Sequence, residues 1–210
     1  MASKSTTQLM SPLSLKLSVV DRFDFIISEC RNKRVLHLGS LAADRKSTLH
    51  QKILDVSSEC WGLDQHSSTI PNHILGDAQN YNLSHLNPDI ILAGEIIEHI
   101  YDIKGFFESA YTTLQSGCSL IITTPNAFSL VHLVKAVFGK IVKNDPYHVL
   151  LYDPTTLSNL YNCYLQTFFW GSICFYREAS ARTFIYRLCN VFSFLSPTFS
   201  PGIILKLTKR

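Results

Sequence analysis

The stretch Asp89–Ile100, DIILAGEIIEHI, starts with the apolar run of a buried strand and ends with two glutamates and a histidine within five residues. If the strand ends at Gly94, then Glu95, Glu98 and His99 are spaced i, i+3 and i+4, which places side chains on one face of a helix. The strand would then deliver two carboxylates and an imidazole to one place. The alternative is an ordinary strand that continues into a solvated helix, and the surrounding sequence decides between the two.

Apolar strands alternate with helices on both sides of this stretch. The apolar runs predict seven strands, at residues 34–38, 60–63, 73–75, 89–93, 119–123, 165–175 and 203–207. Apolar residues at helical spacing predict helices over 19–30, 49–56, 106–114, 130–141 and 154–161. Strands that alternate with helices at this interval pair in parallel through right-handed crossovers. The sequence therefore predicts an α/β fold, a doubly wound, mostly parallel seven-stranded sheet with helices on both faces.

Length and composition fit one domain. The chain has 210 residues, of which 46% are hydrophobic, enough to bury a single core. Residues 1–12 are rich in Ser and Thr and predict a disordered tail, followed by one domain at 13–210. The net charge of only +3 gives no dense basic surface, so nucleic acid is not an expected partner.

The cysteines and the apolar segments indicate where the protein works. Six cysteines without a CxxC pair are typical of buried thiols, and they fit a reducing cytoplasm better than a disulfide framework or a zinc site. The N-terminus lacks the apolar run of a signal peptide, and no segment reaches the roughly 18 apolar residues that a membrane span needs. We therefore expect a cytoplasmic protein without a transmembrane span.

Carboxylates follow two of the predicted strands. In an open parallel sheet, ligands bind beyond the carboxyl ends of the strands, near the point where the strand order reverses. Asp64 closes the second strand, where a carboxylate can accept both hydroxyl protons of a ribose. Asp77 follows the third strand, where it can accept from an exocyclic amine while a backbone N–H meets a ring nitrogen. The pair predicts an adenosine pocket; the plainer alternative for each is an acid in a surface turn.

Five ordered blocks carry a family resemblance: RVLHLGS (34–40), CWGLDQ (60–65), LGDAQ (75–79), PDIILAGEIIEHI (88–100) and GCSLIITTPNAFSL (117–130). Together they resemble the Rossmann-like class of S-adenosylmethionine-dependent methyltransferases. The resemblance implies methyl transfer with S-adenosylmethionine as the cofactor. It implies cofactor contacts from eight residues, His37, Gly39, Ser40, Asp64, Gln65, Asp77, Ala78 and Glu95.

The resemblance also assigns parts of the cofactor to positions. Gly39 would back the methionine part, Asp64 would hold the ribose, Asp77 would meet the adenine amino group, and Glu95 would lie beside the sulfonium. The first loop departs from the family pattern because His37 replaces the usual acid and few of the usual glycines remain. This change removes a partner for the ammonium end of the cofactor. The change therefore leaves an alternative, a non-catalytic protein that retains the fold and acts as a binding partner.

The acidic stretch resembles a metal-binding pattern when His148 is added. Glu95, Glu98, His99 and His148 are similar to the metal ligands of the ubiquinone-pathway O-methyltransferases and the small-RNA terminal 2'-O-methyltransferases. In those families a divalent ion binds vicinal hydroxyls of the acceptor. The mixed set of carboxylates and imidazoles suits Mg, Mn, Fe or Zn. The alternative is that Glu98 and His99 hydrogen-bond nearby backbone. Without a metal, His99 or His148 can serve as the general base, with Glu95 as the third catalytic candidate.

The sequence favours O-methylation of a small-molecule or saccharide-type acceptor. We expect the acceptor to be selected by two segments at 127–164 and 176–201, and the second could also pair with a second subunit in a homodimer. RNA 2'-O-methylation is a weaker alternative because the net charge is modest. An NAD-dependent oxidoreductase is disfavoured, since no GxGxxG follows the first strand.

Overall fold

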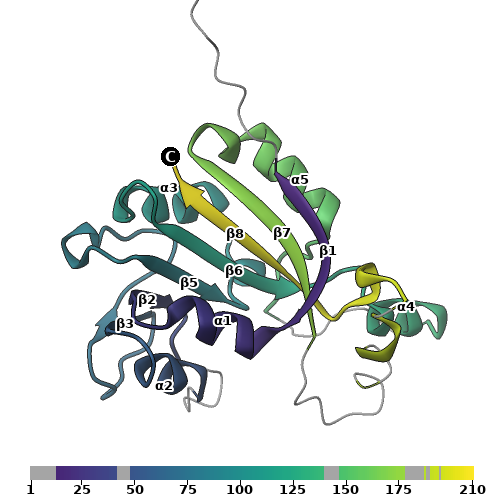
Figure 1. The fold of residues 1–210 in the computed structure, drawn as a ribbon, viewed down its shortest axis with the longest axis horizontal. Helices are drawn as coiled ribbons and strands as arrows, with labels where there is room; N and C mark the ends of the chain where they lie inside the picture. Colours follow the sequence, from purple (N-terminus) through teal and green to yellow (C-terminus); the bar gives the residue numbers. More distant parts are fainter. Residues whose placement is uncertain (1–12, 42–47, 140–146, 178–186, 188–189, 194) are drawn as a thin grey trace, which may run out of the picture.

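The structure is a computed structural model of the chain, and it describes residues 13–41, 48–139, 147–177, 187, 190–193 and 195–210 (Figure 1). The tail expected at 1–12 lies outside the described residues, as does part of the acceptor-side segment expected at 176–201. Within the described residues, no helix has the length and apolar character that a membrane crossing requires.

One eight-stranded sheet organises the molecule. Its strands are β1 (Ser14–Asp21), β2 (Arg34–Leu38), β3 (Glu59–Asp64), β4 (His73–Leu75), β5 (Ile90–Gly94), β6 (Ser119–Pro125), β7 (Phe169–Arg177) and β8 (Gly202–Lys209). They lie in the order β1-β7-β8-β6-β5-β2-β3-β4, and all neighbours are parallel except the pairs that β8 makes with β6 and β7. The predicted α/β fold with a mostly parallel sheet is confirmed, with one strand more than expected.

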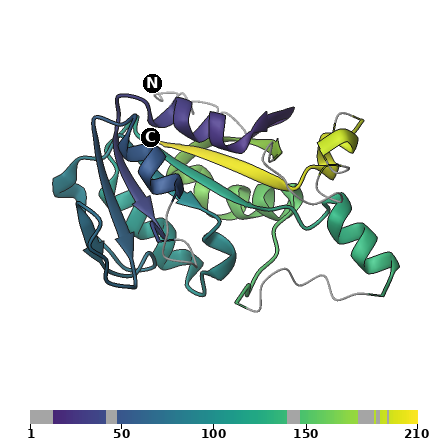
Figure 2. The ribbon, with the colours of Figure 1, turned by 90° about the horizontal axis from the view of Figure 1, so that it is seen from below.

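Helices cover both faces of the sheet. They are α1 (Arg22–Cys30), α2 (Thr48–Leu54), α3 (Ile103–Thr113), α4 (Leu130–Val137) and α5 (Pro154–Cys163), with the short 3-10 helices η1 (Ser84–Leu86), η2 (Ile97–His99), η3 (Leu165–Thr167) and η4 (Pro197–Phe199). Figure 2 shows α1 and α5 on opposite sides of β8. Because strand side chains alternate, Leu36 and Leu38 enter the core beneath α3 and α5, whereas Val35 enters the core beneath α1 and α2.

The N-terminal segment differs from the prediction. Residues 19–30 were expected to form one helix, but Val19 lies in β1 and pairs with Phe175 of β7. Helix α1 begins only at Arg22, because the Asp21 carboxylate caps it by accepting hydrogen bonds from the backbone N–H groups of Phe23 and Asp24. Val19 fits both a strand and a helix period, so the apolar pattern alone did not locate this boundary.

One other strand and one other helix also have boundaries that differ from the predicted ones. The strand expected at 165–175 begins later, at Phe169, because η3 precedes it. The helix expected over 130–141 ends at Val137, and Gly139 follows with a φ of +64°, the left-handed conformation that commonly ends helices. The helix predicted at Asp153-Pro154 is confirmed, since the Asp153 carboxylate accepts from two backbone N–H groups of the first turn of α5.

The strand order positions a ligand site. The chain runs outward from β2 to β4 and then returns to β5, which pairs with the other side of β2. The order therefore reverses between β2 and β5. Ligands of open α/β sheets bind at such a point, beyond the carboxyl ends of the strands.

Candidate functional site

The loops after β2, β3, β4 and β5 carry most of the predicted cofactor residues. Gly39 and Ser40 follow β2, Asp64 ends β3, Asp77 follows β4, and Glu95 follows β5. Since these strands are parallel neighbours, all these residues lie along one edge of the sheet. The structure therefore brings the cofactor candidates to the same edge.

The loop after β2 is held close to β3. Gly39 has a φ of +65°, which glycine adopts without strain, and its N–H donates to the Leu63 carbonyl at 2.8 Å. A Cβ at Gly39 would also lie only 3.3 Å from Ile96. Ser40 is buried, and its Oγ would be 2.5 Å from a Cβ at Gly62, so this hydroxyl packs against the glycine of β3. Ser40 can therefore face a ligand only through its backbone.

Asp64 is fixed by donors on both carboxylate oxygens. Oδ2 accepts from the Leu41 N–H at 3.0 Å, and Oδ1 accepts from the His66 N–H at 3.0 Å, with the His66 Nδ1 3.1 Å away. A carboxylate has about four lone-pair sites, so acceptor capacity for a ribose remains. The first bond also ties the loop after β2 to the end of β3. Gln65, the next residue, is exposed.

Asp77 is positioned by Gln79, a residue that the sequence analysis missed. The Asp77 carboxylate accepts from the backbone N–H of Gln79 at 2.9 Å and from its side-chain amide at 3.2 Å. The side-chain oxygen of Gln79, Oε1, then accepts from the N–H groups of Tyr101 and Asp102. Gln79 thus links the loop after β4 to the turn before α3. Ala78, between them, is buried.

His37 has a different environment from the one predicted. Its ring is buried under α2, where it stacks on His50 with ring centroids 5.4 Å apart and Nδ1 atoms 3.2 Å apart. Burial, and then the charge of His50, lowers the pKa of His37 to about 3. The ring is therefore neutral near pH 7 and cannot replace the negative charge of the acid found in related loops. A cofactor contact from His37 would have to come from its backbone.

Glu95 does not share a helical face with Glu98 and His99, and that prediction was wrong. Glu95 has a φ of +55° and precedes η2. Its Oε1 accepts from the Tyr176 hydroxyl at 2.8 Å and lies 3.3 Å from an Arg22 guanidinium nitrogen. The left-handed turn explains the change, because it directs Glu95 toward β7 and α1. Neither Arg22 nor Tyr176 was identified from the sequence.

Glu98, His99 and His148 form a compact cluster. One ligand atom from each lies within 4.8 Å of the others, and the two imidazole rings meet edge to face at 4.7 Å. His148 is distant in sequence, but the next two backbone N–H groups, of Val149 and Leu150, donate to the Glu98 carbonyl. These two bonds bring the histidine to the glutamate. The cluster contains three of the four predicted metal ligands and lacks Glu95.

The Glu98 carboxyl is buried beside a second carboxylate. Its side chain is 1% exposed, Oε2 accepts from the Thr124 hydroxyl at 3.0 Å, and Oε1 has no hydrogen-bond partner among the described residues. Burial, and then the charge of Glu95, raises the pKa of Glu98 to about 8. With that pKa the carboxyl is largely protonated near pH 7, so a divalent cation held by Glu98 and the two imidazoles would displace its proton.

Tyr152 belongs to the segment at 127–164 that was expected to select the acceptor, but its place beside Glu98 was not predicted. It is 4% exposed, and its hydroxyl has no hydrogen-bond partner among the described residues. Burial, and then the charge of Glu98, raises the pKa of Tyr152. A phenol that remains protonated next to Glu98 can donate a hydrogen bond to an oxygen bound at the cluster.

Comparisons with known proteins agree with this geometry at the level of the fold. A methyltransferase from Archaeoglobus fulgidus, solved as a "SAM dependent methyltransferase", superposes with a TM-score of 0.53 at 16% identity, covering 90% of this chain and 94% of that chain. A Clostridium acetobutylicum S-adenosylmethionine-dependent methyltransferase gives 0.58 at 12% identity, covering 89% of each. The small RNA methyltransferase HEN1 gives 0.64 at 12% identity, covering 90% of this chain and 25% of that chain.

One curated protein is similar in sequence over a short region. The mitochondrial ubiquinone biosynthesis O-methyltransferase of Rattus norvegicus is 35% identical over 52 residues, which are 25% of this chain and 15% of the rat protein. No protein-family model matches the chain. Together with the strand order and the edge residues, the solved structures identify the fold as that of the Rossmann-like S-adenosylmethionine-dependent methyltransferases, as the sequence blocks predicted.

Proposed function

We propose that the protein is an S-adenosylmethionine-dependent methyltransferase that methylates an oxygen atom. The observation that carries the proposal is the placement of Asp64, Asp77 and Glu95 along one sheet edge, beside the cluster of Glu98, His99 and His148. A nucleoside site next to a carboxylate and imidazole cluster is the arrangement needed to bring a methyl donor to a hydroxyl. The likeness to structures of methyltransferases supports it.

The cofactor side provides polar groups that match S-adenosylmethionine. The bound cofactor would supply an electrophilic methyl group, so the protein has mainly to bind and orient the reactants. Asp64 would accept from the ribose hydroxyls, Asp77 from the adenine amine and the loop at Gly39 would support the methionine part. The neutral His37 offers no charge for the ammonium group, so we expect weaker binding of that end.

The acceptor side has two ways to activate a hydroxyl. Glu98, His99 and His148 would hold a divalent ion such as Mg, Mn, Fe or Zn, whose charge favours the deprotonated form of a bound hydroxyl. The unpartnered Oε1 of Glu98 supports this use of the cluster. Without an ion, His99 or His148 would accept the hydroxyl proton. In both cases Glu95, held by Arg22 and Tyr176, would lie between the cluster and the cofactor.

We propose a small-molecule or saccharide hydroxyl as the acceptor. We also propose that the protein acts in the cytoplasm and pairs with a second subunit. The short similarity to an O-methyltransferase of ubiquinone biosynthesis supports a small molecule. The second candidate, RNA 2'-O-methylation, has one supporting observation, the similarity in fold to an RNA methyltransferase. The net charge of +3 argues against it, because RNA binding draws on many basic contacts.

Calorimetric titration with S-adenosylmethionine and S-adenosylhomocysteine tests the proposal. Wild-type protein should bind both, and Asp64→Ala should reduce affinity by roughly 100-fold or more, because a charge-assisted bidentate contact is lost. Asp24→Asn changes a carboxylate in the first turn of α1 and should leave affinity unchanged. Absence of binding by a folded wild-type protein would support the non-catalytic alternative, and unchanged affinity in Asp64→Ala would remove Asp64 from the pocket.

A further inference from the structure

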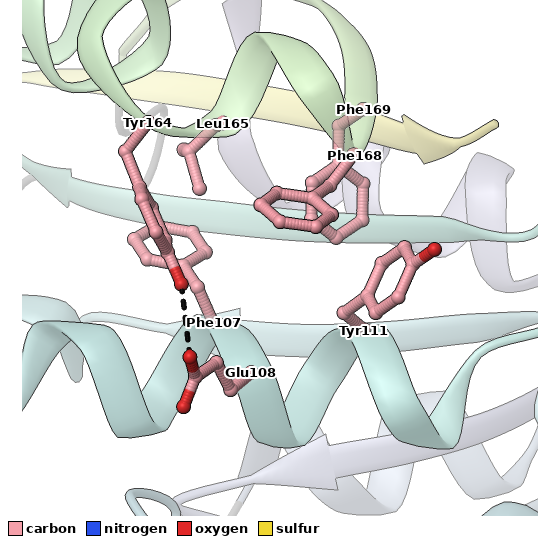
Figure 3. Close-up of a pocket in the computed structure, with 7 residues that line it drawn as sticks. All are labelled: Phe107, Glu108, Tyr111, Tyr164, Leu165, Phe168 and Phe169. Carbon is pink, nitrogen blue, oxygen red and sulfur yellow. Dashed lines mark hydrogen bonds between the residues drawn. The ribbon is translucent and has the colours of Figure 1, made fainter.

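A second pocket lies between α3 and the segment that joins α5 to β7 (Figure 3). The aromatic pocket, as we call it, is lined by Phe107, Glu108, Tyr111, Tyr164, Leu165, Phe168 and Phe169. Its cavity has a volume of about 20 Å³, which accommodates one water-sized or methyl-sized group.

The aromatic pocket is separate from the candidate active site. Phe169 is the first residue of β7 and is paired with Lys209 at the end of β8, next to Ser119 at the start of β6. The strands β5 and β6 are parallel, so the start of β6 lies at the sheet edge opposite the one that carries Glu95. A ligand here would not occupy the cofactor edge.

Ring faces and edges form the walls of the aromatic pocket. The Tyr111 and Phe168 rings meet at 5.0 Å and 64°, and the Tyr164 and Phe168 rings at 5.7 Å and 56°. The faces of such rings carry partial negative charge and attract cations. The chain already uses this property at Tyr111, because the Lys209 ammonium lies 4.0 Å from the centre of that ring.

A fixed carboxylate adds negative charge at the opening. Glu108 Oε1 accepts from the Tyr164 hydroxyl at 3.3 Å (Figure 3), and the side chain of Glu108 is 55% exposed. The pKa of Tyr164 is raised, first by burial and then by the negative charges of Glu108 and Asp102. Two carboxylates therefore contribute negative charge near Tyr164. Lys104 forms an exposed ion pair with Glu108 at 3.5 Å, and because its side chain is 71% exposed this pair can be broken at little cost.

We propose that the aromatic pocket binds the N-methylated ammonium group of a small molecule. One methyl group would enter the cavity, and the positive charge would lie against the ring faces and Glu108. A primary ammonium fits less well, because the apolar walls give its N–H groups few acceptors. A neutral apolar group fits less well too, because it gains no attraction from the ring faces or from Glu108.

Titration of the full-length protein with choline, followed by NMR, tests this inference. The uncharged isostere 3,3-dimethylbutan-1-ol has the same shape and serves as the ligand control. Choline should bind saturably and at least roughly fivefold more tightly than the isostere, since the cation contributes the difference. Equal binding of the two ligands, or no saturable choline binding, would overturn the proposal.

Matched variants locate the binding. Glu108→Gln and Phe168→Leu should each weaken choline binding by roughly fivefold or more, whereas Glu59→Gln, an exposed carboxylate at the start of β3, should not change it. Circular dichroism confirms that each variant is folded. If Glu108→Gln and Phe168→Leu both keep wild-type affinity, choline binds elsewhere and the inference fails. Cofactor binding is measured separately, so failure here does not affect the proposed methyltransferase function.

Discussion

The cofactor side and the acceptor side of the candidate active site are assembled over different sequence distances. On the cofactor side, Asp64 and Asp77 each accept a hydrogen bond from a residue two positions further along the chain, and Asp64 also accepts from Leu41 in the loop of the neighbouring strand. On the acceptor side, Glu98 accepts from Thr124, 26 residues away, and Glu95 accepts from Tyr176, 81 residues away. The first side is built mainly by loops at strand ends, and the second by tertiary packing.

This difference determines what each side needs in order to form. The loops of the cofactor side require that β2, β3 and β4 pair in the right order and that Gln79 meets the turn before α3. The acceptor side also requires β7, α1 and the segment at His148 to reach their final places, because they supply Tyr176, Arg22 and a cluster member. Substitutions on the acceptor side can therefore alter the site from a distance, whereas those on the cofactor side should act locally.

The largest effect we expect is a pH dependence of stability caused by His37. The sequence assigned this residue to the cofactor side, but the structure buries its ring in the core. Its pKa is about 3 in the folded protein, against an ordinary value of 6.5. Between these values the unfolded chain binds more protons, so the free energy of unfolding should fall as pH falls, by about 1.4 kcal/mol per pH unit from this group. Urea denaturation at pH 7, 6, 5 and 4 measures the slope.

His37→Leu provides the comparison, because leucine is apolar and cannot titrate. Its stability should depend less on pH below 6.5 than that of the wild type, whereas His85→Leu, at an exposed position, should follow the wild-type curve. If the stability of the wild type and of His37→Leu depended on pH in the same way, the His37 ring would be open to solvent in the folded protein. The ring would then again be a candidate for contact with the cofactor.

The next effect separates the two glutamates of the acceptor side. Glu98→Gln removes a ligand of the proposed metal cluster, and we expect affinity for Mn²⁺ to fall by roughly 100-fold or more. Glu95→Gln is the matched control, because Arg22 and Tyr176 hold the Glu95 carboxylate. This substitution should reduce Mn²⁺ affinity by less than about tenfold. Calorimetry with Mn²⁺ measures both. Equal losses would restore Glu95 as a ligand, and a wild-type protein that binds no Mn²⁺ would leave the imidazoles as the proposed bases.

The same difference explains how much the sequence could predict. Asp64, Asp77 and Glu95 were placed at strand ends because a buried strand and the turn after it are local patterns. Arg22 and Tyr176 were missed because nothing in the sequence around them marks them, and Tyr152 was expected only as part of the acceptor-selecting segment at 127–164. The packed sheet brings the first two to Glu95 and the third near Glu98. The left-handed turn at Glu95 was also unexpected, since sequence spacing assumed a regular helix from Gly94 onward.

The smallest effect tests whether the cofactor side is as local as its bonds indicate. Gln79→Ala removes the side-chain donor to Asp77 and the acceptor for the N–H groups of Tyr101 and Asp102. We expect the free energy of unfolding to fall by about 1–2 kcal/mol and S-adenosylmethionine affinity to fall modestly, with Mn²⁺ affinity unchanged. Gln115→Ala, at an exposed site, should change stability by less than about 0.5 kcal/mol. Loss of Mn²⁺ binding in Gln79→Ala would show that the two sides are coupled through the turn at 101–102, whose N–H groups the Gln79 side chain accepts from.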